Sequence, residues 1–485
     1  MMFLNRQREL GYLDSRYRRP GAEIAVIYGR RRVGKTALVF EWSRDKRCAF
    51  FFAQRLDSAT LLRQFSRELA LVDQPAAHPS MELRPALSKA EVTSVPADFS
   101  YPDWESAFRA MGDLAREQRL VVVIDEYPYL VEMVPGISTV LQKAWDLVLQ
   151  HTNLFLILTG SLLSVMRRHL LDSQAPLYRR HTWPFELRPL QVNDLRAFFP
   201  QRSPAELVDT FAVLGGMPHY LISVDREATL MQNIEQDILS PAGSLFDEPR
   251  LQLHEELRGD IESYMRILGA IAGGAHYRRD VATRSGLGDA NKVDWHLATL
   301  VELGLIEHRQ PVSRIRKPRR WGTYHLRDPF FRFWHRWVLP RRNYLEIGQG
   351  QQETLDQIRR HMPYIVAPVW EEIARTHLYT ASARGDIPIQ IEEVGSWWSR
   401  DTQIDIVAVN RAERRVVFGE AKWQRVTITQ ADLDGLVNRG LRWLDDDPYW
   451  DVHYVFFARE FGRVSDAVAA DPHVHLYTAE DVVGI

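Results

Sequence analysis

Residues 24–42 read IAVIYGRRRVGKTALVFEW, which joins an expected strand, a glycine-containing loop and an expected helix. The loop fits the pattern G-x4-G-K-[ST], whose glycines let main-chain N–H groups approach phosphates without obstruction by side chains. Lys35 supplies a cation for the β- and γ-phosphates, and Thr36 offers a hydroxyl to Mg²⁺. This P-loop predicts binding of ATP with Mg²⁺ through Gly29, Arg30, Arg31, Arg32, Val33, Gly34, Lys35, Thr36 and Ala37.

A second apolar run, at 121–126, reads VVVIDE and ends in two acids. At the carboxyl end of a parallel strand, Asp125 is expected to hold Mg²⁺ through water, and Glu126 to polarise the attacking water. A further strand is expected between the two motifs, at 48–53. This order resembles the division of P-loop proteins that places a catalytic glutamate beside the metal-binding aspartate. We therefore predict ATP hydrolysis with Lys35 and Glu126 as catalytic residues.

Two later polar groups are candidates for sensing the nucleotide. The next apolar strand ends in Thr159–Gly160–Ser161, where Ser161 either senses the γ-phosphate or caps a helix. Arg179 and Arg180 follow a loop, and Arg180 is predicted to contact the γ-phosphate from the same chain or from a neighbouring subunit. The second arrangement requires a homo-oligomer. An ordinary surface arginine is the alternative interpretation.

Length and composition bound the class of protein. A chain of 485 residues predicts about three domains, and 45% hydrophobic with 26% charged residues indicates a globular protein. The net charge of −2 requires any basic surface to be local. The single cysteine excludes a disulfide framework and a cysteine zinc site. The apolar runs are far shorter than the ~20 residues of a membrane helix, so we expect a cytoplasmic protein without a membrane partner.

The chain is expected to be a multidomain α/β protein. In residues 1–245, apolar strands alternate with helical patterns, which predicts a parallel sheet followed by a helical lid from about 185. Prolines recur through 73–103, which is interpreted as a surface insertion. Residues 341–485 return to an α/β pattern after a different middle segment, with a helix at 363–380, strands near 387–394, 403–409, 415–420 and 453–457, and a helix near 430–444.

The middle segment, 246–340, has the spacing of three helices followed by a strand, and LATLVELGLIEH at 297–308 resembles the last helix and first wing strand of winged-helix proteins. The loop 314–320 carries five cations where a wing would lie, which favours contact with a DNA backbone. Packing against the nucleotide domain, with a merely solvated loop, is the alternative. The aromatic run at 330–337 alternates at helical spacing and is interpreted as core.

Residues 403–407 and 416–423 predict a hairpin that brings Asp405 beside Glu420 and Lys422. Strand alternation directs residues 420 and 422 to the same face. Two carboxylates and the Ala421 carbonyl form an oxygen-rich Mg²⁺ site, and Lys422 positions a water against a phosphodiester. The histidines, including His473 and His475, show no ligand set and are interpreted as surface or edge-strand residues.

The hairpin pattern resembles the PD-(D/E)XK nuclease core. The resemblance implies catalytic roles for Asp405, Glu420 and Lys422, with metal held by Asp405 and Glu420. It also implies a third acid on the first core helix, and Glu371 or Glu372 fits, with Glu371 the predicted metal ligand.

Several segments together resemble the archaeal-type ATPases of the STAND/AAA+ group that end in the DUF234 domain. They are NRQREL at 5–10, VIDE at 123–126, TGS at 159–161, LYRR at 177–180 with LRPL at 187–190, and GGMPHYL at 215–221. The resemblance covers nearly the whole chain. It implies that the first box lies near the nucleotide base and that DUF234 shares the nuclease fold. Arg179 replaces the glycine usual in relatives.

These motifs predict an ATP-driven switch coupled to DNA binding and to Mg²⁺-dependent cleavage of DNA by residues 341–485. The alternative hypothesis is an ATP-regulated DNA-binding, signalling or defence module in which the nuclease-like domain is inactive and serves as a docking platform.

Overall fold

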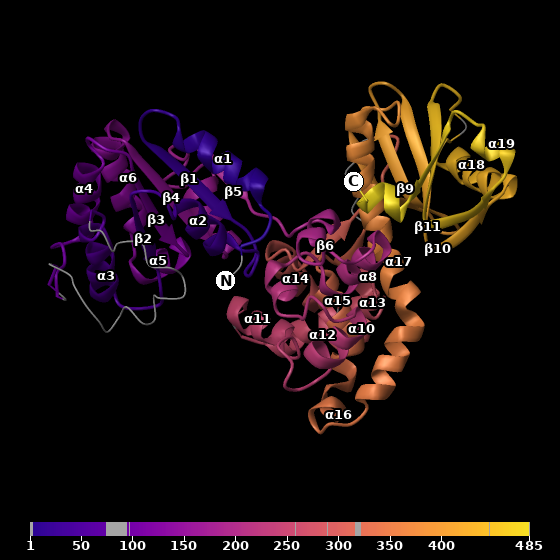
Figure 1. Cartoon of the computed structure of the whole chain (residues 1–485), viewed down its shortest axis with the longest axis horizontal. Coiled ribbons are helices and arrows are strands. Elements are labelled where there is room, and N and C mark those ends of the chain that lie inside the picture. Colours follow the sequence, from indigo (N-terminus) through magenta and orange to yellow (C-terminus); the bar gives the residue numbers. More distant parts are fainter. Residues whose placement is uncertain are drawn as a thin grey trace. The chain divides into compact units, whose positions relative to one another are not determined.

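A computed structural model describes residues 3–73, 95–96, 98–257, 259–288, 290–315, 322–445 and 447–484. The chain divides into two compact units, residues 1–189 and 190–485 (Figure 1). The predicted three-part division at 245 and 340 stays a prediction, and most of the expected insertion at 73–103 lies outside the described residues. Among the described helices, none is both long enough and apolar enough to cross a membrane.

The first unit is built on a parallel five-stranded sheet in the order β2-β3-β4-β1-β5. The strands are β1 (Glu23–Tyr28), β2 (Cys48–Phe52), β3 (Leu120–Asp125), β4 (Leu154–Gly160) and β5 (Trp183–Glu186). The helices are α1 (Gln7–Tyr17), α2 (Lys35–Ser43), α3 (Ser58–Ala70), α4 (Trp104–Leu114), α5 (Tyr127–Met133), α6 (Ile137–Leu147) and α7 (Leu163–Met166).

Both faces of this sheet are covered by helices (Figure 1), because its strands are apolar on both sides. On one face, strand residues such as Val122 and Leu156 join a core built with α3, α4, α5 and α6. On the other face, Phe155 contacts Trp42 of α2 and Tyr17 of α1. The predicted βαβ sheet is confirmed, and the P-loop lies at its carboxyl edge.

The second unit begins with a helical region. Its helices are α8 (Pro204–Leu214), α9 (Pro218–Ile222), α10 (Leu230–Asn233), α11 (Glu248–Glu256), α12 (Ile261–Ala272), α13 (Arg278–Arg284), α14 (Ala290–Glu302), α15 (Pro329–Trp337) and α16 (Arg342–Glu346). The antiparallel pair β6 (Ile306–Arg309) and β7 (Thr323–Leu326) follows α14. Helices α12, α13 and α14 followed by strand β6 match the three helices and one strand expected in this segment, and the winged-helix assignment stays a prediction. The aromatic α15 is core, as expected, with Phe330 and Trp334 fully buried.

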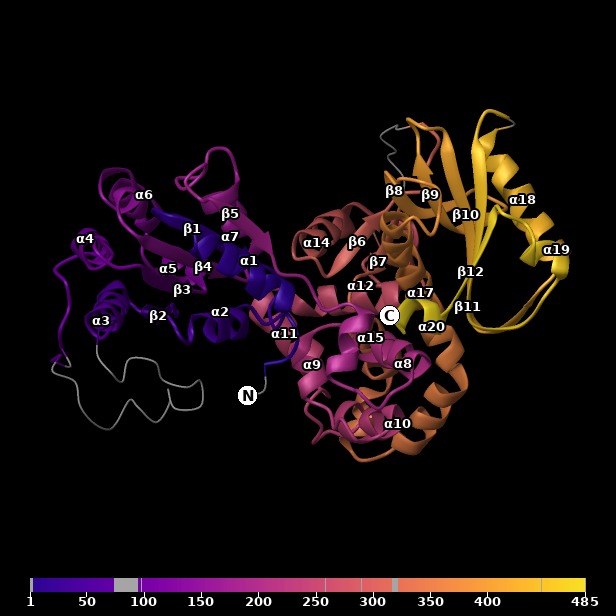
Figure 2. The same ribbon diagram turned by 45° about the horizontal axis from the view of Figure 1, so that its top comes forward.

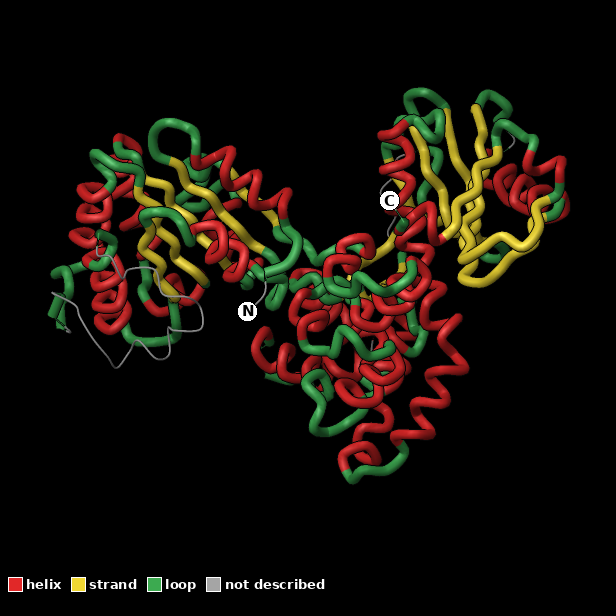
Figure 3. Tube along the Cα trace, viewed as in Figure 1, coloured by secondary structure: helices red, strands yellow, loops and turns green. Residues whose placement is uncertain are grey.

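The chain then enters α17 (Gln351–Arg384), the long helix coloured orange in Figures 1 and 2. It leads to a mixed sheet in the order β12-β11-β10-β9-β8, drawn in yellow with its neighbouring helices in red in Figure 3. The elements are β8 (Glu393–Trp398), β9 (Gln403–Asn410), β10 (Arg415–Ile428), α18 (Gln430–Leu444), β11 (Asp451–Val464), α19 (Asp466–Ala469), β12 (Val474–Thr478) and α20 (Ala479–Val483).

Helices cover both faces of this sheet, as they do in the first unit. Leu436 and Trp443 of α18 pack on one face with Phe418, and Trp370 of α17 contacts Phe457 on the other. The fold class predicted from the sequence, a P-loop parallel sheet with a separate C-terminal α/β sheet, is confirmed.

Some boundaries differ from the expectation. Helix α17 starts at Gln351, 12 residues before the predicted start at 363. The prediction began the helix at Pro363 because proline favours the first turn of a helix, but this helix continues through Pro363 and Pro368. The first C-terminal strand begins at Glu393 rather than at 387. Strands β10 and β11 extend beyond their apolar centres, since their polar ends continue to pair with each other.

Candidate active sites

The P-loop connects the end of β1 to the start of α2, and two of its glycines are required by geometry. A Cβ atom on Gly29 would lie 2.4 Å from the carbonyl oxygen of Leu187, so any side chain there would collide with the backbone. Gly34 has φ of 94°, a left-handed conformation that strains other residues. The loop therefore depends on both positions of the motif.

Lys35 is 4% exposed and points back over the loop. Its Nζ donates to the carbonyl oxygens of Gly29 and Arg30 at 3.0 and 3.2 Å, and lies 3.9 Å from Oε1 of Glu126. A buried ammonium group must keep acceptors or an anion around it. These distances place the cation between the loop and the end of β3, where a phosphate would meet it.

Asp125, at the end of β3, is held by two hydroxyl groups. Thr36 Oγ1 donates to its Oδ2 at 2.7 Å, and Thr159 Oγ1 donates to its Oδ1 at 2.5 Å. Burial raises the pKa of Asp125, and the two hydroxyl donors oppose that shift. The structure thus brings together Thr36 and Asp125, the two predicted Mg²⁺ residues.

Glu126 follows directly and has a left-handed backbone with φ of 54°. Its N–H donates to Thr159 Oγ1 at 3.1 Å, while its Oε2 accepts from the N–H and Oγ of Ser161 at 3.1 and 2.9 Å. Ser161 therefore orients the predicted base, and its predicted contact with the γ-phosphate stays a prediction. Thr159 contacts both Asp125 and Glu126. The sequence signal for this role is its position at the end of an apolar strand, two residues before Ser161.

Arg6 of the NRQREL box belongs to this site and is absent from the predicted set. The buried guanidinium donates from Nη2 to the carbonyl oxygens of Val33 and Arg188, at 3.2 and 2.8 Å, and its Nη1 lies 3.0 Å from Glu9. One side chain thus joins the box, the P-loop and the LRPL segment. A buried arginine needs such acceptors, but the sequence does not show which carbonyls will meet it.

Arg180 lies away from the phosphate edge. Its Nε and Nη2 pair with Asp146 at 2.7 and 2.8 Å, in the last turn of α6 before β4 begins. Two residues later, the N–H of Thr182 donates to Ile24 at the start of β1. Both contacts lie at the amino edge of the parallel sheet, opposite the P-loop. The predicted contact of Arg180 with the γ-phosphate of its own chain is therefore wrong, and contact from a neighbouring subunit stays a prediction.

The residues at the carboxyl edge fit a nucleoside triphosphate with Mg²⁺. The loop can approach phosphates because Gly29 and Gly34 carry no side chain, Lys35 supplies a buried cation, and Thr36 with Asp125 presents paired oxygen ligands. Glu126 lies beside them with an oriented carboxylate.

The second site lies on the hairpin of β9 and β10. The antiparallel register pairs Gly419 with Ile406, so the next residues along the two strands are Glu420 and Asp405. The Ala421 N–H donates to Oδ2 of Asp405 at 3.3 Å, which fixes this carboxylate against the Glu-x-Lys strand. Glu420 and Lys422 alternate with the buried Ala421, as expected for residues on one face.

Glu371 of α17 faces this hairpin. Burial, together with the nearby charge of Asp405, raises the pKa of Glu371 from its ordinary value of 4.5 to about 7. Arg375, one turn later, lies 3.5 Å from Glu371 and donates to the main-chain oxygen of Asp405 at 2.9 Å. The structure therefore brings Glu371 to Asp405, and a divalent cation would relieve the repulsion between their carboxylates.

Glu420 is held by cations rather than by hydroxyl groups. Its Oε1 lies 3.2 Å from Arg439 of α18 and its Oε2 lies 3.5 Å from Lys422. The predicted ligands Glu371, Asp405 and Glu420 supply the oxygen atoms that Mg²⁺ prefers. They fit such an ion, provided that Glu420 exchanges at least one of these partners.

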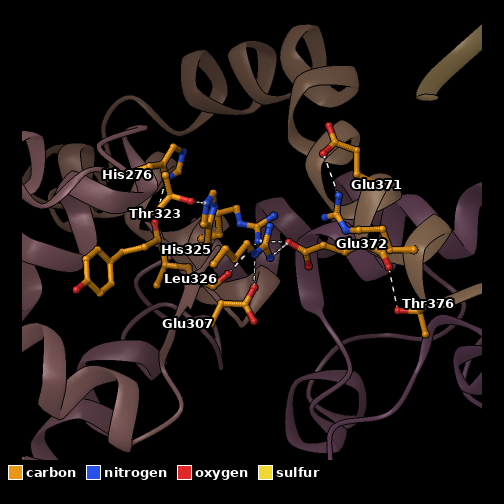
Figure 4. A network of polar contacts seen from close by, with 12 residues as sticks. His276, Glu307, Thr323, His325, Leu326, Glu371, Glu372 and Thr376 are labelled. Atoms are coloured by element: carbon orange, nitrogen blue, oxygen red, sulfur yellow. Dashed lines mark hydrogen bonds and ion pairs between the residues drawn. The ribbon is translucent and has the colours of Figure 1, made fainter. Parts of the chain in front are cut away.

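Glu372, the other candidate acid, points into an ion-pair network shown in Figure 4. Its Oε1 accepts from Arg309 at 2.6 Å and from Arg332 at 3.0 Å, and Arg309 also pairs with Glu307. Although burial alone would raise it, the charges of Arg332 and Arg309 hold the pKa of Glu372 down at about 2. Glu372 therefore ties α17 to the β6–β7 hairpin and is unavailable to the Asp405 site.

Two known protein families match separate parts of this chain, one around the P-loop and one around the Asp405 site. Residues 3–224 match a family described as an ATPase domain predominantly from Archaea, and residues 334–433 match DUF234, described as archaeal and bacterial proteins of unknown function. The chain belongs to the archaeal-type ATPases that carry a DUF234 domain. The ATPase match continues past residue 189 into α8 and α9. The DUF234 match contains Glu371, Asp405, Glu420 and Lys422.

Individual relatives extend along most or part of this DUF234 ATPase. An uncharacterized protein of Methanocaldococcus jannaschii is 27% identical over 423 residues, which cover 87% of this chain and 88% of the relative. An uncharacterized ATP-binding protein of the same organism is 40% identical over 47 residues, 10% of this chain and 80% of the relative. The solved Walker-type ATPase of Pyrococcus abyssi has a TM-score of 0.49 at 18% identity, covering 68% of this chain and 95% of that one.

The basic loop expected to bind DNA lies mainly outside the described residues, which end at Ile315 and resume at Gly322. Arg314 is described, and it is engaged within its own unit. It donates to the Leu444 carbonyl oxygen at 2.6 Å and lies 3.1 and 3.6 Å from Asp445 and Asp447. One of the five expected cations therefore anchors the segment after β6 to the carboxyl end of α18.

The interpretation of the C-terminal histidines needs correction. His473 and His475 were expected to lack a ligand set, yet His473 lies with Asp451 and His453 so that one potential ligand atom of each falls within 4.8 Å of the others. Sequence spacing concealed this cluster, because parallel pairing of β11 with β12 brings together residues twenty positions apart.

Proposed function

We propose that this DUF234 ATPase is an ATP-hydrolysing switch that controls Mg²⁺-dependent cleavage of DNA at the site of Asp405, Glu420, Lys422 and Glu371. The observation that carries the proposal is the convergence of Glu371 and Asp405, both of which contact Arg375. Burial, and then the charge of Asp405, raises the pKa of Glu371 to about 7. Such a strained carboxylate pair in an oxygen-rich site is suited to a divalent cation.

Hydrolysis of ATP follows from the arrangement of the first unit. Glu126, oriented by Ser161, accepts a hydrogen bond from the attacking water, while Lys35 faces the charge that develops on the phosphates. Thr36 and Asp125 would hold Mg²⁺, which supplies neutralisation of phosphate charge when bound. Thr159 keeps both acids in register with each other.

At the second site, Asp405, Glu420 and Glu371 would hold Mg²⁺, which acts as a Lewis acid toward a phosphodiester when bound. Lys422, on the same face as Glu420, positions a water for attack on phosphorus. Arg375 holds the strand of Asp405 through its main-chain oxygen. The carboxylates thus supply the metal ligands, Lys422 orients the water, and Arg375 fixes the strand that carries Asp405.

A cavity of about 1000 Å³ supports nucleic acid as the substrate, because it connects the region of Glu371 with several cations. Its lining includes Arg309, Arg332, Arg336 and Arg341. The Nη1 atom of Arg332 is buried and has no hydrogen-bond partner among the described residues. Phosphate oxygens would satisfy such a donor, and arginine is well suited to bind them.

Coupling between the sites is proposed to run through the connection at 187–190. In the first unit the Leu187 N–H pairs with Tyr28, just before the P-loop, and in the second the Leu190 N–H pairs with Gly216 after α8. Helix α8 carries Asp209, which accepts from Nε1 of Trp423 at 2.9 Å. Trp423 follows Lys422 directly, so a shift of α8 would move the Glu-x-Lys strand.

The test uses full-length protein with ATP, Mg²⁺ or Mn²⁺, supercoiled plasmid and single-stranded DNA. Wild type should cleave DNA in a nucleotide-dependent manner, Asp405→Asn should not cleave it, and Asp401→Asn, an exposed change four residues earlier, should behave as wild type. Asp405→Asn should keep its ATPase rate. Equal cleavage by wild type and Asp405→Asn, or none by either under any nucleotide, would refute the nuclease assignment.

A second candidate, an ATP-regulated DNA-binding or signalling module with a docking domain, is favoured by one observation. Arg439 and Lys422 already neutralise Glu420, which suits a stable surface without a metal. This candidate predicts salt-sensitive DNA binding that depends on the arginines of the cavity, with no cleavage and no change in affinity when Asp405 becomes Asn.

A further inference from the structure

Three histidines and an aspartate gather at the amino ends of β11 and β12, several residues along the sheet from Glu420, which pairs with Phe456. The parallel register pairs Val455 with His475 and Tyr454 with Val474. Because side chains alternate along strands, Asp451 and His453 of β11 face the same side as His473 and His475. Phe457 and Tyr477, farther along this face, stack with ring centroids 5.1 Å apart, which confirms the alignment of the two strands.

One distance within the cluster already matches that between two ligands of one ion, and the third group lies close by. His453 Nε2 lies 3.4 Å from Oδ1 of Asp451, and one potential ligand atom each of Asp451, His453 and His473 falls within 4.8 Å of the others. A tetrahedral ion with bonds of about 2.0–2.1 Å separates its ligand atoms by about 3.3 Å. The rings of His453 and His473 lie 5.0 Å apart, so small side-chain rotations suffice to close the set.

The second ring nitrogens of the histidines and the second oxygen of Asp451 have other partners, so the remaining nitrogen and oxygen atoms are available to a metal ion. His453 Nδ1 lies 3.4 Å from His475 Nε2, and His473 Nδ1 lies 3.4 Å from Asp471. Oδ2 of Asp451 pairs with Arg415 at 3.2 Å, so its Oδ1 remains directed at His453. Metal-bound histidines usually bind a partner through their second ring nitrogen, which sets the tautomer and the ring orientation.

We propose that Asp451, His453 and His473 bind a divalent transition-metal ion of the zinc class, with His475 and Asp471 orienting the two imidazoles. Two nitrogen ligands and one oxygen ligand favour zinc, cobalt or nickel over Mg²⁺, which requires oxygen ligands. Three protein ligands leave a fourth position for water. His453 is 5% exposed, so the ion would lie against the sheet and be accessible mainly from the side of His473.

The site would clamp an edge strand. Strand β12 pairs only with β11 in the described sheet, and α20 follows it directly. Asn193 and Arg196 donate to the carbonyl oxygens of Val482 and Val483 in α20, so β12 carries a contact toward the start of the second unit. A metal that links β11 to β12 would hold this end of the sheet in place.

The test uses full-length protein from which any histidine tag has been removed, stripped of metal and titrated with Co²⁺ alone. Wild type should bind one ion per chain with the visible absorption typical of tetrahedral cobalt, and an equal amount of Zn²⁺ should displace it. A large excess of Mg²⁺ should not. Zn²⁺ alone should raise the midpoint of thermal unfolding. Displacement by Mg²⁺ or absence of the tetrahedral spectrum would overturn the assignment.

Matched variants locate the ion. His453→Gln and Asp451→Asn should lose the spectrum, and His475→Gln should weaken binding about 10–100-fold, as expected for an orienting partner. His151→Gln, an exposed change in the first unit, should bind Co²⁺ as wild type. The ATPase rate and circular dichroism of each variant show that it is folded. Unchanged Co²⁺ binding in folded His453→Gln and Asp451→Asn would refute this site without affecting the proposed nuclease.

Discussion

The two acidic sites of this chain are held in opposite ways. At the P-loop, Asp125 and Glu126 accept hydrogen bonds from hydroxyl groups on α2 and just after or within β4. At the hairpin, Glu420 is bound by Arg439 and Lys422. Asp125 and Glu126 can bind a cation without losing a close ion pair, because Lys35 lies no nearer than 3.9 Å to Glu126, whereas Glu420 must first give up Arg439 or Lys422. The first site is therefore preformed, whereas the second must rearrange before Glu420 can bind a cation.

The largest effect is expected when the preformed site loses its base. Glu126→Gln should keep ATP affinity, because Lys35 and the loop are untouched, while turnover falls about 10²–10⁴-fold. Phosphate release at saturating ATP measures the rate, and a fluorescent nucleotide measures the affinity. Glu132→Gln, in α5 where Glu132 pairs with Arg55, is the control. Turnover equal to wild type in Glu126→Gln would remove Glu126 from the mechanism.

The next effect concerns the acid of α17 that faces the hairpin of β6 and β7. Glu372→Gln leaves Arg309 and Arg332 without their shared anion, and losing this partly buried network costs up to about 3 kcal/mol. The urea midpoint of the unfolding transition of the second unit should fall accordingly. Glu353→Gln, on the exposed first turn of α17, should change it little. A loss no larger than that of the control would show that the network is not a structural anchor.

Replacing Glu371 should raise the stability of the protein rather than lower it, because the folded-state pKa of Glu371 is raised to about 7 from an ordinary 4.5. The folded protein then binds more protons between these values, so stability is highest below about pH 4.5 and falls as pH rises toward 7. Glu371→Gln removes this loss and should be more stable than wild type above pH 7, by on the order of 1–3 kcal/mol. Metal-free urea unfolding from pH 5 to 8 measures the difference, and a difference that does not vary with pH would contradict it.

The smallest effect is expected at Glu420, the acid that is already paired with cations. Arg439→Gln frees Glu420 from one cation, and such a half-exposed pair contributes about 0.2–1 kcal/mol. Calorimetric titration should therefore show Mn²⁺ binding to the C-terminal site up to about five-fold more tightly. Arg442→Gln, in the last turn of the same helix, is the control. Weaker Mn²⁺ binding would mean that Arg439 supports the site rather than competing with the metal.

Sequence alone located most of the first site because its groups are close in the chain or directly follow apolar strands. The placement of Arg180 failed for a specific reason: β5 was not recognised as a strand parallel to β1. A residue that precedes a parallel strand lies at its amino edge, so the presence of β5 would have directed Arg180 away from the phosphates. Arg6 was missed because its partners are carbonyl oxygens, which no residue type reveals.

Local spacing determined the P-loop, the acid pair and the alternation of Glu420 with Lys422, since each depends on the geometry of one strand or loop. The sequence named Glu371 as the predicted ligand with Glu372 as a second fit, and only the tertiary structure showed that these adjoining acids face different neighbours. The tertiary structure alone assembled Asp451, His453 and His473 from separate strands. The physical reason is that charge and ligand geometry depend on which distant groups lie within a few ångströms, and strand pairing sets those distances.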